Sequence, residues 1–278
     1  MPVPDPIVKN AAPFLKWAGG KRQLLSQYAR YFPPTETIQR YFEPFIGSAA
    51  VFFHLQPPRA MLSDRNEKLI EVYRAVQQEV EAVIAALEGH RNEEDYYYAV
   101  RAQNPAELSP AERAARLIYL NRTCYNGLYR ENSRGEFNVP FGRYRNPKIC
   151  NKKRLRTAAR ALQPVTLCAG DFAEVVTTAG AGDFVYFDPP YAPLSATSSF
   201  TGYDKYGFGE ADQTRLAQMV HELTGRGCRV MLSNSSATLI YDLYEGHGYR
   251  LIPIQARRSI NSKADGRGPV KELLILNY

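Results

Sequence analysis

The sequence predicts an α/β fold in which a parallel sheet is interrupted by a mainly helical insertion. Three observations lead to this fold class. Short runs rich in β-branched and aromatic residues alternate with helical segments at the start of the chain. The middle of the chain has apolar residues at three- and four-residue spacing, and the alternating pattern then resumes. Strands that alternate with helices are typical of parallel sheets.

The first elements read as a strand–loop–helix–strand unit. A glycine-containing loop, FLKWAGGK, leads into a helix over 22–32, which Pro33-Pro34 ends because proline cannot continue the helical hydrogen-bond ladder. Further elements follow in order: a strand at 40–42, a loop at 43–48, a helix over 49–55 and a strand over 59–64 that ends on Asp64.

The middle of the chain predicts a separate unit, residues 67–150, inserted between residues 1–66 and 151–278 of the sheet-forming part. The apolar spacing predicts one long helix over 67–87 and another over 113–127, stopped by Asn126-Gly127. An irregular stretch rich in Arg, Tyr, Asn, Gly and Pro extends from there to Cys150.

The α/β pattern after the insertion supplies the rest of the sheet. We expect these elements: a strand over 164–171 that ends on Asp171, a strand over 184–187 that runs into Pro-Pro, a helix over 212–227, a buried strand over 228–234, and a terminal hairpin of 249–259 with 270–278 whose loop is basic.

Composition excludes several classes of protein. The 278 residues are 45% hydrophobic, enough for a sizeable core, yet no apolar run is long enough to span a membrane. The N-terminus shows no export signal. The four cysteines are widely spaced and lie in no metal-ligand pattern, which argues against a disulfide scaffold and against a metal site. We therefore expect a cytoplasmic protein without a metal cofactor, a membrane attachment or an obligate protein partner.

Positive charge is concentrated in one segment. Between Arg113 and Arg160 there are 13 Lys or Arg and two acids, a net charge of +11, so the rest of the chain sums to −4. Such a segment favours phosphate binding, with a solvated basic surface as the alternative. Within it we assign only non-specific charge to Arg122, Lys152, Lys153 and Arg154.

The tetrapeptide Asp188-Pro189-Pro190-Tyr191 follows directly after a predicted strand. Ligands of open α/β sheets bind at the carboxyl ends of strands. A carboxylate from Asp188 and a carbonyl from the rigid Pro189 could both accept from one exocyclic amino group, and Tyr191 could stack on the base that carries it. The alternative is a proline-rich turn with an aspartate cap.

Two further loops carry weaker signals. Gly47, between a strand and a helix, allows close approach of a ligand, and Asp64 ends the next strand, where an acid can bind a ribose. An ordinary tight turn explains this pattern equally well. Gly19-Gly20-Lys21 fails the phosphate-loop pattern, because Lys16 stands where that pattern needs glycine and Arg22 where it needs Ser or Thr.

Taken together, the motifs resemble the Dam-type DNA adenine-N6 methyltransferases of the D12 class. The matching blocks occur in the family's order and span nearly the whole chain: FLKWAGGK (14–21), EPFIGS (43–48), YNGLYR (125–130), RGEFNVPFGRY (134–144), DPPYAPLSAT (188–197) and RRSI (257–260).

The resemblance implies a Rossmann-like sheet that binds S-adenosylmethionine (AdoMet), with an inserted helical target-recognition domain. By that resemblance, the cofactor-binding residues are Trp17, Lys21, Phe45, Gly47, Asp64, Asp171 and Phe172, and Asp188, Pro189 and Tyr191 hold the flipped adenine. The family's glycine motif commonly has a second glycine where this chain has Ala49, which puts AdoMet affinity in question.

The resemblance also implies double-stranded DNA as partner, with GATC as the recognised sequence. Bases would be read by Lys16, Leu128, Arg130 and Pro140, Tyr125 would enter the opened stack beside Asn126, and Arg143 and Tyr144 would hold the backbone. When bound to DNA, the protein would be associated with the nucleoid.

Several alternatives stay open on the sequence. The same acceptors suit cytosine N4 or adenine in RNA, and a DNA-binding regulator without turnover is a different class of function. No cysteine follows a proline, so the Pro-Cys nucleophile of cytosine-C5 enzymes is absent. The biological role could be genome marking for repair and replication timing, protection from a paired restriction nuclease, or service to a phage.

Overall fold

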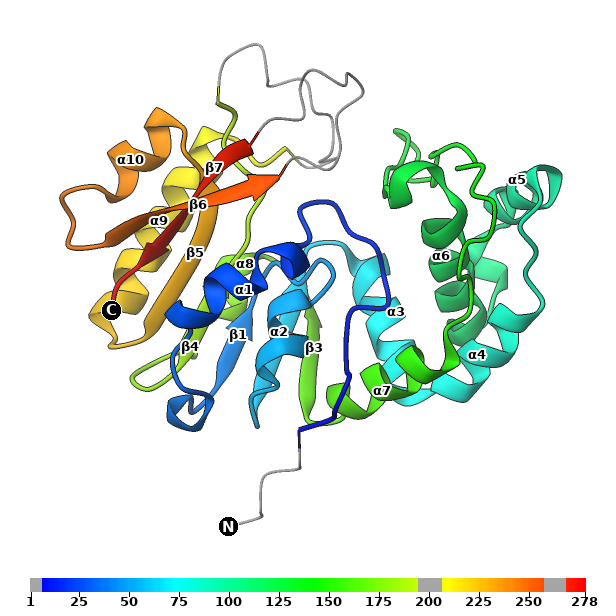
Figure 1. Ribbon diagram of the computed structural model, residues 1–278, viewed down its shortest axis with the longest axis horizontal. Helices are drawn as coiled ribbons and strands as arrows, with labels where there is room; N and C mark the ends of the chain where they lie inside the picture. The colour runs from blue at the N-terminus through cyan, green and yellow to red at the C-terminus, as the bar shows by residue number, and fades with distance from the viewer. Residues whose placement is uncertain (1–6, 195–206, 258–268) are drawn as a thin grey trace.

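The computed structural model describes residues 7–194, 207–257 and 269–278. Its centre is a seven-stranded sheet in the order β3-β2-β1-β4-β5-β7-β6 (Figure 1). The strands are β1 (Tyr41–Glu43), β2 (Ala60–Asp64), β3 (Val165–Ala169), β4 (Phe184–Phe187), β5 (Arg229–Ser235), β6 (Arg250–Arg257) and β7 (Pro269–Leu276). The first five are parallel, whereas β7 runs antiparallel to both β5 and β6. This is the Rossmann-like α/β fold that the resemblance implied.

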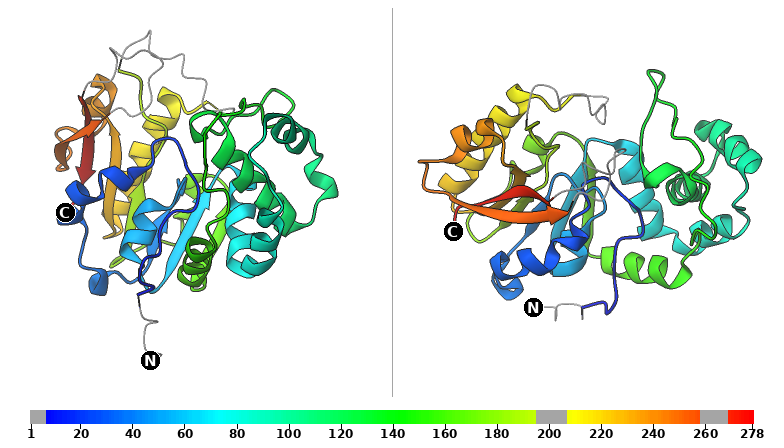
Figure 2. Two further views of the ribbon diagram at one scale, coloured as in Figure 1. Left: turned by 45° about the vertical axis from the view of Figure 1, so that its right-hand side comes forward. Right: turned by 45° about the horizontal axis from the view of Figure 1, so that its top comes forward.

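Alternating side chains of β4 divide the core into two layers. Phe184 and Tyr186 belong to the cluster on one face of the sheet, and Val185 and Phe187 belong to the cluster on the other face. All four residues are fully buried, as expected for a central parallel strand covered by helices on both sides. The second face is covered by α9 (Glu210–Gly225) and α10 (Thr238–Tyr244) (Figure 2).

Helices α3 (Glu67–Gln78), α4 (Val80–Glu88), α5 (Glu94–Ala102) and α6 (Pro110–Thr123) lie beyond the β3 edge of the sheet (Figure 1). The prediction of one helix over 67–87 was wrong. The backbone leaves the helical region at Glu79 (φ −135°, ψ 39°), and α3 and α4 both pack against α6. Helix α3 also contacts β2 and β3. The unit boundaries at 66/67 and 150/151 stay a prediction.

Local boundaries differ from the sequence prediction in two places that matter for the site. The helix expected over 22–32 is broken into α1 (Leu25–Tyr28) between the 3-10 turns η1 (Lys21–Gln23) and η2 (Ala29–Tyr31). Strand β3 ends at Ala169, so Asp171 lies beyond the strand and caps the short helix α8 (Phe172–Val175) through the Ala173 N–H.

The remaining elements were either predicted or missed. Helix α2 (Ala50–Leu55), α9 and the terminal hairpin of β6 with β7 confirm the predictions, although the hairpin's basic loop, and with it most of RRSI, lies outside the described residues. The helices α5, α7 (Lys152–Leu162) and α10 were not predicted. Within the described residues, no helix is long and apolar enough to cross a membrane.

Candidate active site

A cavity of about 1520 Å³ opens at the carboxyl ends of β1, β2 and β4. Strand order reverses between β1 and β4, and the crevice at such a reversal is where open α/β sheets bind ligands. The cavity is lined by all ten predicted cofactor and catalytic residues, Trp17, Lys21, Phe45, Gly47, Asp64, Asp171, Phe172, Asp188, Pro189 and Tyr191, and by Arg130 of the predicted DNA-binding set. The fold thus brings together motifs that lie up to 174 residues apart in the sequence.

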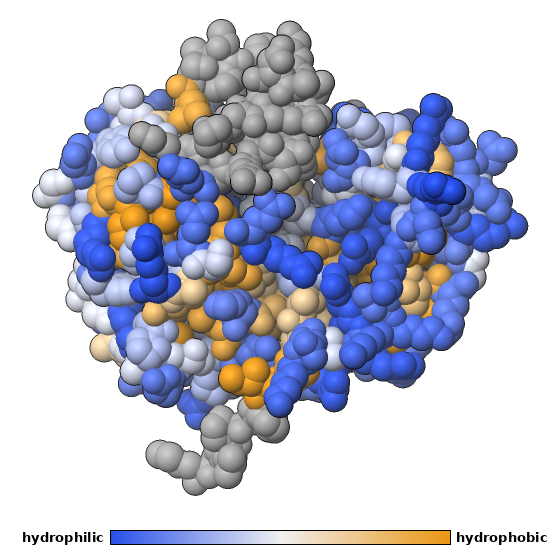
Figure 3. Space-filling view, viewed as in Figure 1, coloured by the Kyte–Doolittle hydropathy of each residue, from blue (hydrophilic) through white to orange (hydrophobic). Residues whose placement is uncertain are grey.

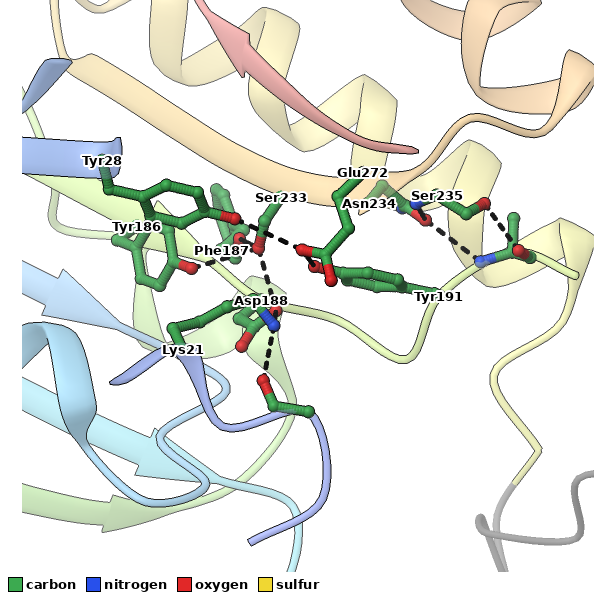
Figure 4. Close-up of polar contacts among 12 residues, drawn as sticks. Lys21, Tyr28, Tyr186, Phe187, Asp188, Tyr191, Ser233, Asn234, Ser235 and Glu272 are labelled. Atoms are coloured by element: carbon green, nitrogen blue, oxygen red, sulfur yellow. Dashed lines mark hydrogen bonds and ion pairs between the residues drawn. The ribbon is translucent and has the colours of Figure 1, made fainter. Parts of the chain in front are cut away.

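Asp188 and Lys21 form an ion pair at the floor of this cavity. The Lys21 ammonium lies 2.7 Å from Asp188 Oδ1 and donates to the Gly19 carbonyl at 2.7 Å, with only 4% of its side chain exposed (Figure 4). The Ser233 hydroxyl donates to the same Oδ1 at 2.8 Å. Both contacts fall on Oδ1, so among the described residues Oδ2 is the carboxylate oxygen left to accept from a ligand.

A polar run at the end of β5 holds the Asp-Pro-Pro-Tyr loop in place. Asn234 Oδ1 accepts from the Ala192 N–H at 3.0 Å, and the Ser235 hydroxyl donates to the Ala192 carbonyl at 2.6 Å (Figure 4). From α9, Gln213 donates to the Pro190 carbonyl at 2.8 Å and accepts from Asn234 at 3.0 Å. No motif in the sequence assigns these residues a role. The signal available was the polar Ser-Asn-Ser that closes an apolar strand.

Tyr191 is anchored from the antiparallel strand β7. Its hydroxyl donates to Glu272 Oε2 at 2.7 Å, and the Lys21 ammonium lies 4.8 Å from the centre of its ring. Burial raises the pKa of Glu272, while the nearby Lys21 cation favours its charged form. Glu272 was not predicted from the sequence, because nothing in VKELLILNY marks one acid on a terminal strand as part of the site.

A second buried carboxyl, Glu43, lies at the end of β1 and also lines the cavity. It accepts from the Tyr41 hydroxyl at 2.8 Å and from the Phe52 N–H at 3.1 Å. Complete burial raises the pKa of Glu43 to about 8, so at neutral pH this carboxyl is mostly uncharged. It therefore adds little negative charge to the floor of the cavity.

The backbone of Gly47 packs so closely against the Trp17 ring that a residue with a side chain would not fit at position 47. Gly47 has φ +45°, and a Cβ at this position would lie 2.9 Å from Trp17 Cδ1. The Gly47 N–H donates to Asp64 Oδ2 at 3.3 Å, and the Asn66 N–H donates to Asp64 Oδ1 at 2.9 Å. Gly47 and Asp64, whose pattern was ambiguous in the sequence, are thus joined by a hydrogen bond and lie together at the cavity wall.

An aromatic cluster of Phe45, Phe172 and Phe208 also lines the cavity. Phe45 and Phe172 stack with ring centres 5.5 Å apart, and Phe208 meets Phe45 edge-on at 5.7 Å. Asp171 is held by a bidentate ion pair with Arg215 (2.7 and 2.8 Å), which lowers the pKa of its carboxyl. Phe208 and Arg215 were not singled out from the sequence. They belong to segments whose place beside Phe172 only the fold determines.

Ala49, which replaces the family's second glycine, adopts a left-handed conformation (φ 55°, ψ 34°) at the start of α2. Its side chain is fully buried. The departure therefore strains the backbone, at a cost of about 1–2 kcal/mol for a residue with a Cβ. It does not narrow the cavity, whose wall here is formed by Gly47, Ser48 and Ala50.

The predicted base-reading residues gather around the end of α6. Asn121, fully buried, accepts from the Lys16 N–H at 2.8 Å and donates to the Lys16 carbonyl at 2.7 Å. The Lys16 ammonium lies 4.4 Å from the centre of the Tyr144 ring. A Cβ on Gly127 would lie 2.5 Å from Lys16 Cδ, so only glycine lets this loop pass so close.

The other predicted DNA-contacting residues occupy the segment that follows. Tyr125 is 49% exposed, and its N–H donates to the Pro140 carbonyl at 2.9 Å. Asn126 has φ 55°, so the chain turns sharply at this residue. Leu128 caps the end of the short 3-10 turn Tyr125–Gly127. Arg130 Nε donates to Asn138 Oδ1 at 2.7 Å, and Arg143 is paired with Glu94 at 3.4 Å. Except for Arg130, none of the eight predicted DNA-contacting residues lines the cavity.

Much of the basic segment's charge is engaged within the protein. The half-buried Arg122 donates to the Phe14 carbonyl at 2.5 Å, and Arg154 donates to the Pro13 carbonyl at 3.4 Å, so both anchor the N-terminal loop. Their assignment as purely non-specific charge was incomplete. Lys152 pairs with Glu88. On the face that Figure 3 shows, hydrophilic residues nonetheless dominate over the helical part of the molecule.

No group of three or more His, Cys, Asp or Glu side chains that could hold a metal ion occurs among the described residues. The site therefore offers carboxylates, carbonyls and aromatic rings around an enclosed floor, with one buried lysine. Such a set suits an organic cofactor and a planar base with an amino group.

Comparison with known proteins agrees with this chemistry. Residues 17–260 match the D12 class N6 adenine-specific DNA methyltransferases. The chain is 43% identical over 277 residues to the Type II methyltransferase M1.LlaDCHI of Lactococcus lactis subsp. cremoris, covering 97% of this chain and 96% of that protein. It is 44% identical to the Type II methyltransferase M.MjaIII of Methanocaldococcus jannaschii, covering 96% and 99%. It is 38% identical to the DNA adenine methylase of Escherichia coli K12, covering 96% and 95%. The chain belongs to the D12 class of N6 adenine-specific DNA methyltransferases, enzymes that use S-adenosylmethionine.

Proposed function

We propose that this enzyme methylates N6 of an adenine that is flipped out of duplex DNA, within the sequence GATC. The observation that carries the proposal is the acceptor oxygen of Asp188 in the cavity, with Pro189 beside it in the cavity lining. Asp188 has Oδ2 available while Lys21 and Ser233 fix Oδ1, and Pro189 follows at the strand-order reversal. Two acceptors aimed at one amino group orient the nitrogen lone pair toward an electrophile.

AdoMet fits the rest of the cavity. At Gly47, which packs against Trp17, the cavity wall is bare backbone, so a ligand can approach closely. Asp64 offers a carboxylate for ribose hydroxyls. The rings of Phe45 and Phe172 offer faces for an adenine ring. Lys21 and Asp171 complete the predicted set. When bound, AdoMet supplies a methyl group on a positively charged sulfur.

The protein's own residues then act on the target base. We assign Asp188 and Pro189 to accept the N6 hydrogens and Tyr191 to stack on the ring. Extruding a base from the duplex costs a few kcal/mol. We assign Tyr125, which is half exposed and lies on the turn at Asn126, to fill the gap in the stack.

Recognition of GATC rests on the surface around α6. We assign base contacts to Lys16, Leu128, Arg130 and Pro140, and backbone contacts to Arg143 and Tyr144. Arginine is the commonest bidentate partner of guanine. The Arg143–Glu94 pair is solvent-exposed, with 78% and 44% of the two side chains accessible, so exchanging Glu94 for a phosphate costs little.

Mapping of methyl groups tests the proposal. Plasmid DNA from a methylation-deficient host is incubated with the enzyme and AdoMet, and N6-methyladenine is located by sequencing. Methyl groups confined to GATC are expected. Methyladenine at another motif would contradict the base contacts and retain the chemistry. Methyl groups on cytosine N4 or on RNA alone would contradict the substrate assignment, and sequence-specific binding without turnover would favour a regulator.

A further inference from the structure

We propose that Glu272 is an electrostatic positioning residue for methyl transfer: its carboxylate fixes the Tyr191 ring and keeps the reaction centre net negative despite the buried Lys21. This inference rests on the proposed function, because it concerns the charge that develops on the target amino group. Nothing in the motifs assigns a role to this acid on β7.

Glu272 contacts the Asp-Pro-Pro-Tyr loop through Tyr191 and the N-terminal part of the chain through Tyr28 (Figure 4). Its Oε2 accepts from the Tyr191 hydroxyl at 2.7 Å and, more weakly, from the Tyr28 hydroxyl at 3.5 Å. The ring of Tyr191 lies 4.8 Å from the Lys21 ammonium, which is itself paired with Asp188 at 2.7 Å. Glu272 thus reaches the catalytic loop from a strand that runs antiparallel to the rest of the sheet.

The charges of the neighbouring groups explain why a carboxylate at Glu272 would matter. Lys21 neutralises Asp188, so the pair alone presents no net charge to the substrate. Glu43 is mostly uncharged at neutral pH, because burial raises its pKa to about 8. Glu272, whose carboxylate is favoured by the nearby Lys21 and by the Tyr191 hydroxyl, then supplies the negative charge that the Lys21–Asp188 pair lacks.

Methyl transfer makes such a charge useful. The N6 lone pair forms the new N–C bond as the S–C bond breaks, the sulfur keeps the bonding electron pair, and the positive charge passes to N6, which then releases one proton to water. A positive charge is therefore present at the reaction centre until N6 releases this proton. A fixed carboxylate in a partly desolvated site stabilises it, whereas an unbalanced ammonium would oppose it.

Two substitutions separate charge from hydrogen bonding. Glu272→Gln keeps an oxygen that can accept from Tyr191 and removes the charge. Tyr191→Phe removes the same hydrogen bond and keeps both the ring and the charge. Calorimetric titration of each protein, without DNA, with cationic AdoMet and with its neutral product S-adenosylhomocysteine measures the effect of the charge directly.

We expect Glu272→Gln to weaken AdoMet relative to S-adenosylhomocysteine by about 3- to 10-fold, a change in the affinity ratio that a purely structural role would not produce. Tyr191→Phe should leave this ratio within about 2-fold of wild type. In single-turnover methylation of DNA, Glu272→Gln should be about 10- to 100-fold slower than wild type. Glu272→Asp, which keeps the charge, should preserve the affinity ratio and serves as the second variant if Glu272→Gln folds poorly.

An unchanged affinity ratio in Glu272→Gln would overturn the proposal, as would equal ratios in Glu272→Gln and Tyr191→Phe that both differ from wild type. A wild-type enzyme that binds AdoMet but methylates no DNA would contradict the proposed function instead, since the titrations contain no DNA.

Discussion

Removal of the Asp188 carboxylate should cost the enzyme stability as well as activity. The acceptor role that the sequence gives Asp188 predicts only that Asp188→Ala loses activity. In the structure, however, Asp188 is the ion-pair partner of Lys21, whose side chain is 4% exposed. The alanine variant therefore leaves a buried ammonium without its main counterion.

The size of the stability loss depends on the contacts that the Lys21 ammonium keeps in the variant. Breaking a buried pair by removing one partner costs about 3–5 kcal/mol. Lys21 keeps the Gly19 carbonyl at 2.7 Å and the Tyr191 ring at 4.8 Å, so we expect a loss near the lower end or below it. A loss of about 2–3 kcal/mol corresponds to a fall in Tm of about 4–10 °C for a protein of this size.

Matched variants isolate the cause. Asp188→Asn keeps an oxygen for Lys21 and Ser233, and should lose less stability than Asp188→Ala. Both single variants should lose about 10²- to 10³-fold in methylation rate, because each removes the charged acceptor for N6. The double variant Asp188→Ala with Lys21→Met should regain most of the lost Tm and remain inactive.

The assays are calorimetric unfolding and incorporation of labelled methyl groups into DNA. A Tm of Asp188→Ala within 1 °C of wild type would refute the argument that the ion pair stabilises the fold. Substantial methylation by either single variant would refute the assigned role of the carboxylate.

Three further predictions concern other parts of the site. For Glu43, the pKa of about 8 in the folded protein lies above the unfolded value. Between these two pKa values the folded protein holds a proton that the unfolded chain releases. The free energy of unfolding of the wild type should therefore fall as pH rises from about 4.5 to 8. Glu43→Gln should therefore gain stability over wild type through this window, and a pH-independent difference in Tm would contradict the assignment. For Gly47, substitution by alanine should lower AdoMet affinity at least 10-fold in calorimetric titration, because φ is +45° and the new Cβ would meet Trp17 at 2.9 Å; Gly89→Ala, with no atom within 4 Å of the new Cβ, is the control. For Tyr125, 49% exposed, alanine should leave Tm within about 1 °C and reduce base flipping, measured by 2-aminopurine fluorescence at the target position; the exposed Tyr98→Ala is its control, and equal fluorescence changes in the two would rule out the wedge role.

Sequence reasoning succeeded where local patterns are strong. The apolar strand before Asp188, the glycine turn at Gly47 and the acid at the end of β2 are all local features, and the parallel arrangement of their strands places them at one edge of the sheet. Local patterning also predicted the antiparallel terminal hairpin. It failed at Glu79, where a continuous helical pattern breaks because α3 and α4 each pack separately against α6.

The sequence by itself determined the motifs and the chemistry they can offer: a carboxylate and rigid carbonyl, a glycine-lined turn, a basic recognition segment. Only the tertiary structure decided which distant groups complete them. Ser233, Gln213 and Glu272 come from β5, α9 and β7, and the fold alone brings their side chains within hydrogen-bonding distance of the catalytic loop. The physical reason is that a lone serine, glutamine or glutamate carries no periodicity or turn signal. Its role arises from desolvation and from partners far away in the chain, as the buried pairing of Lys21 with Asp188 also shows.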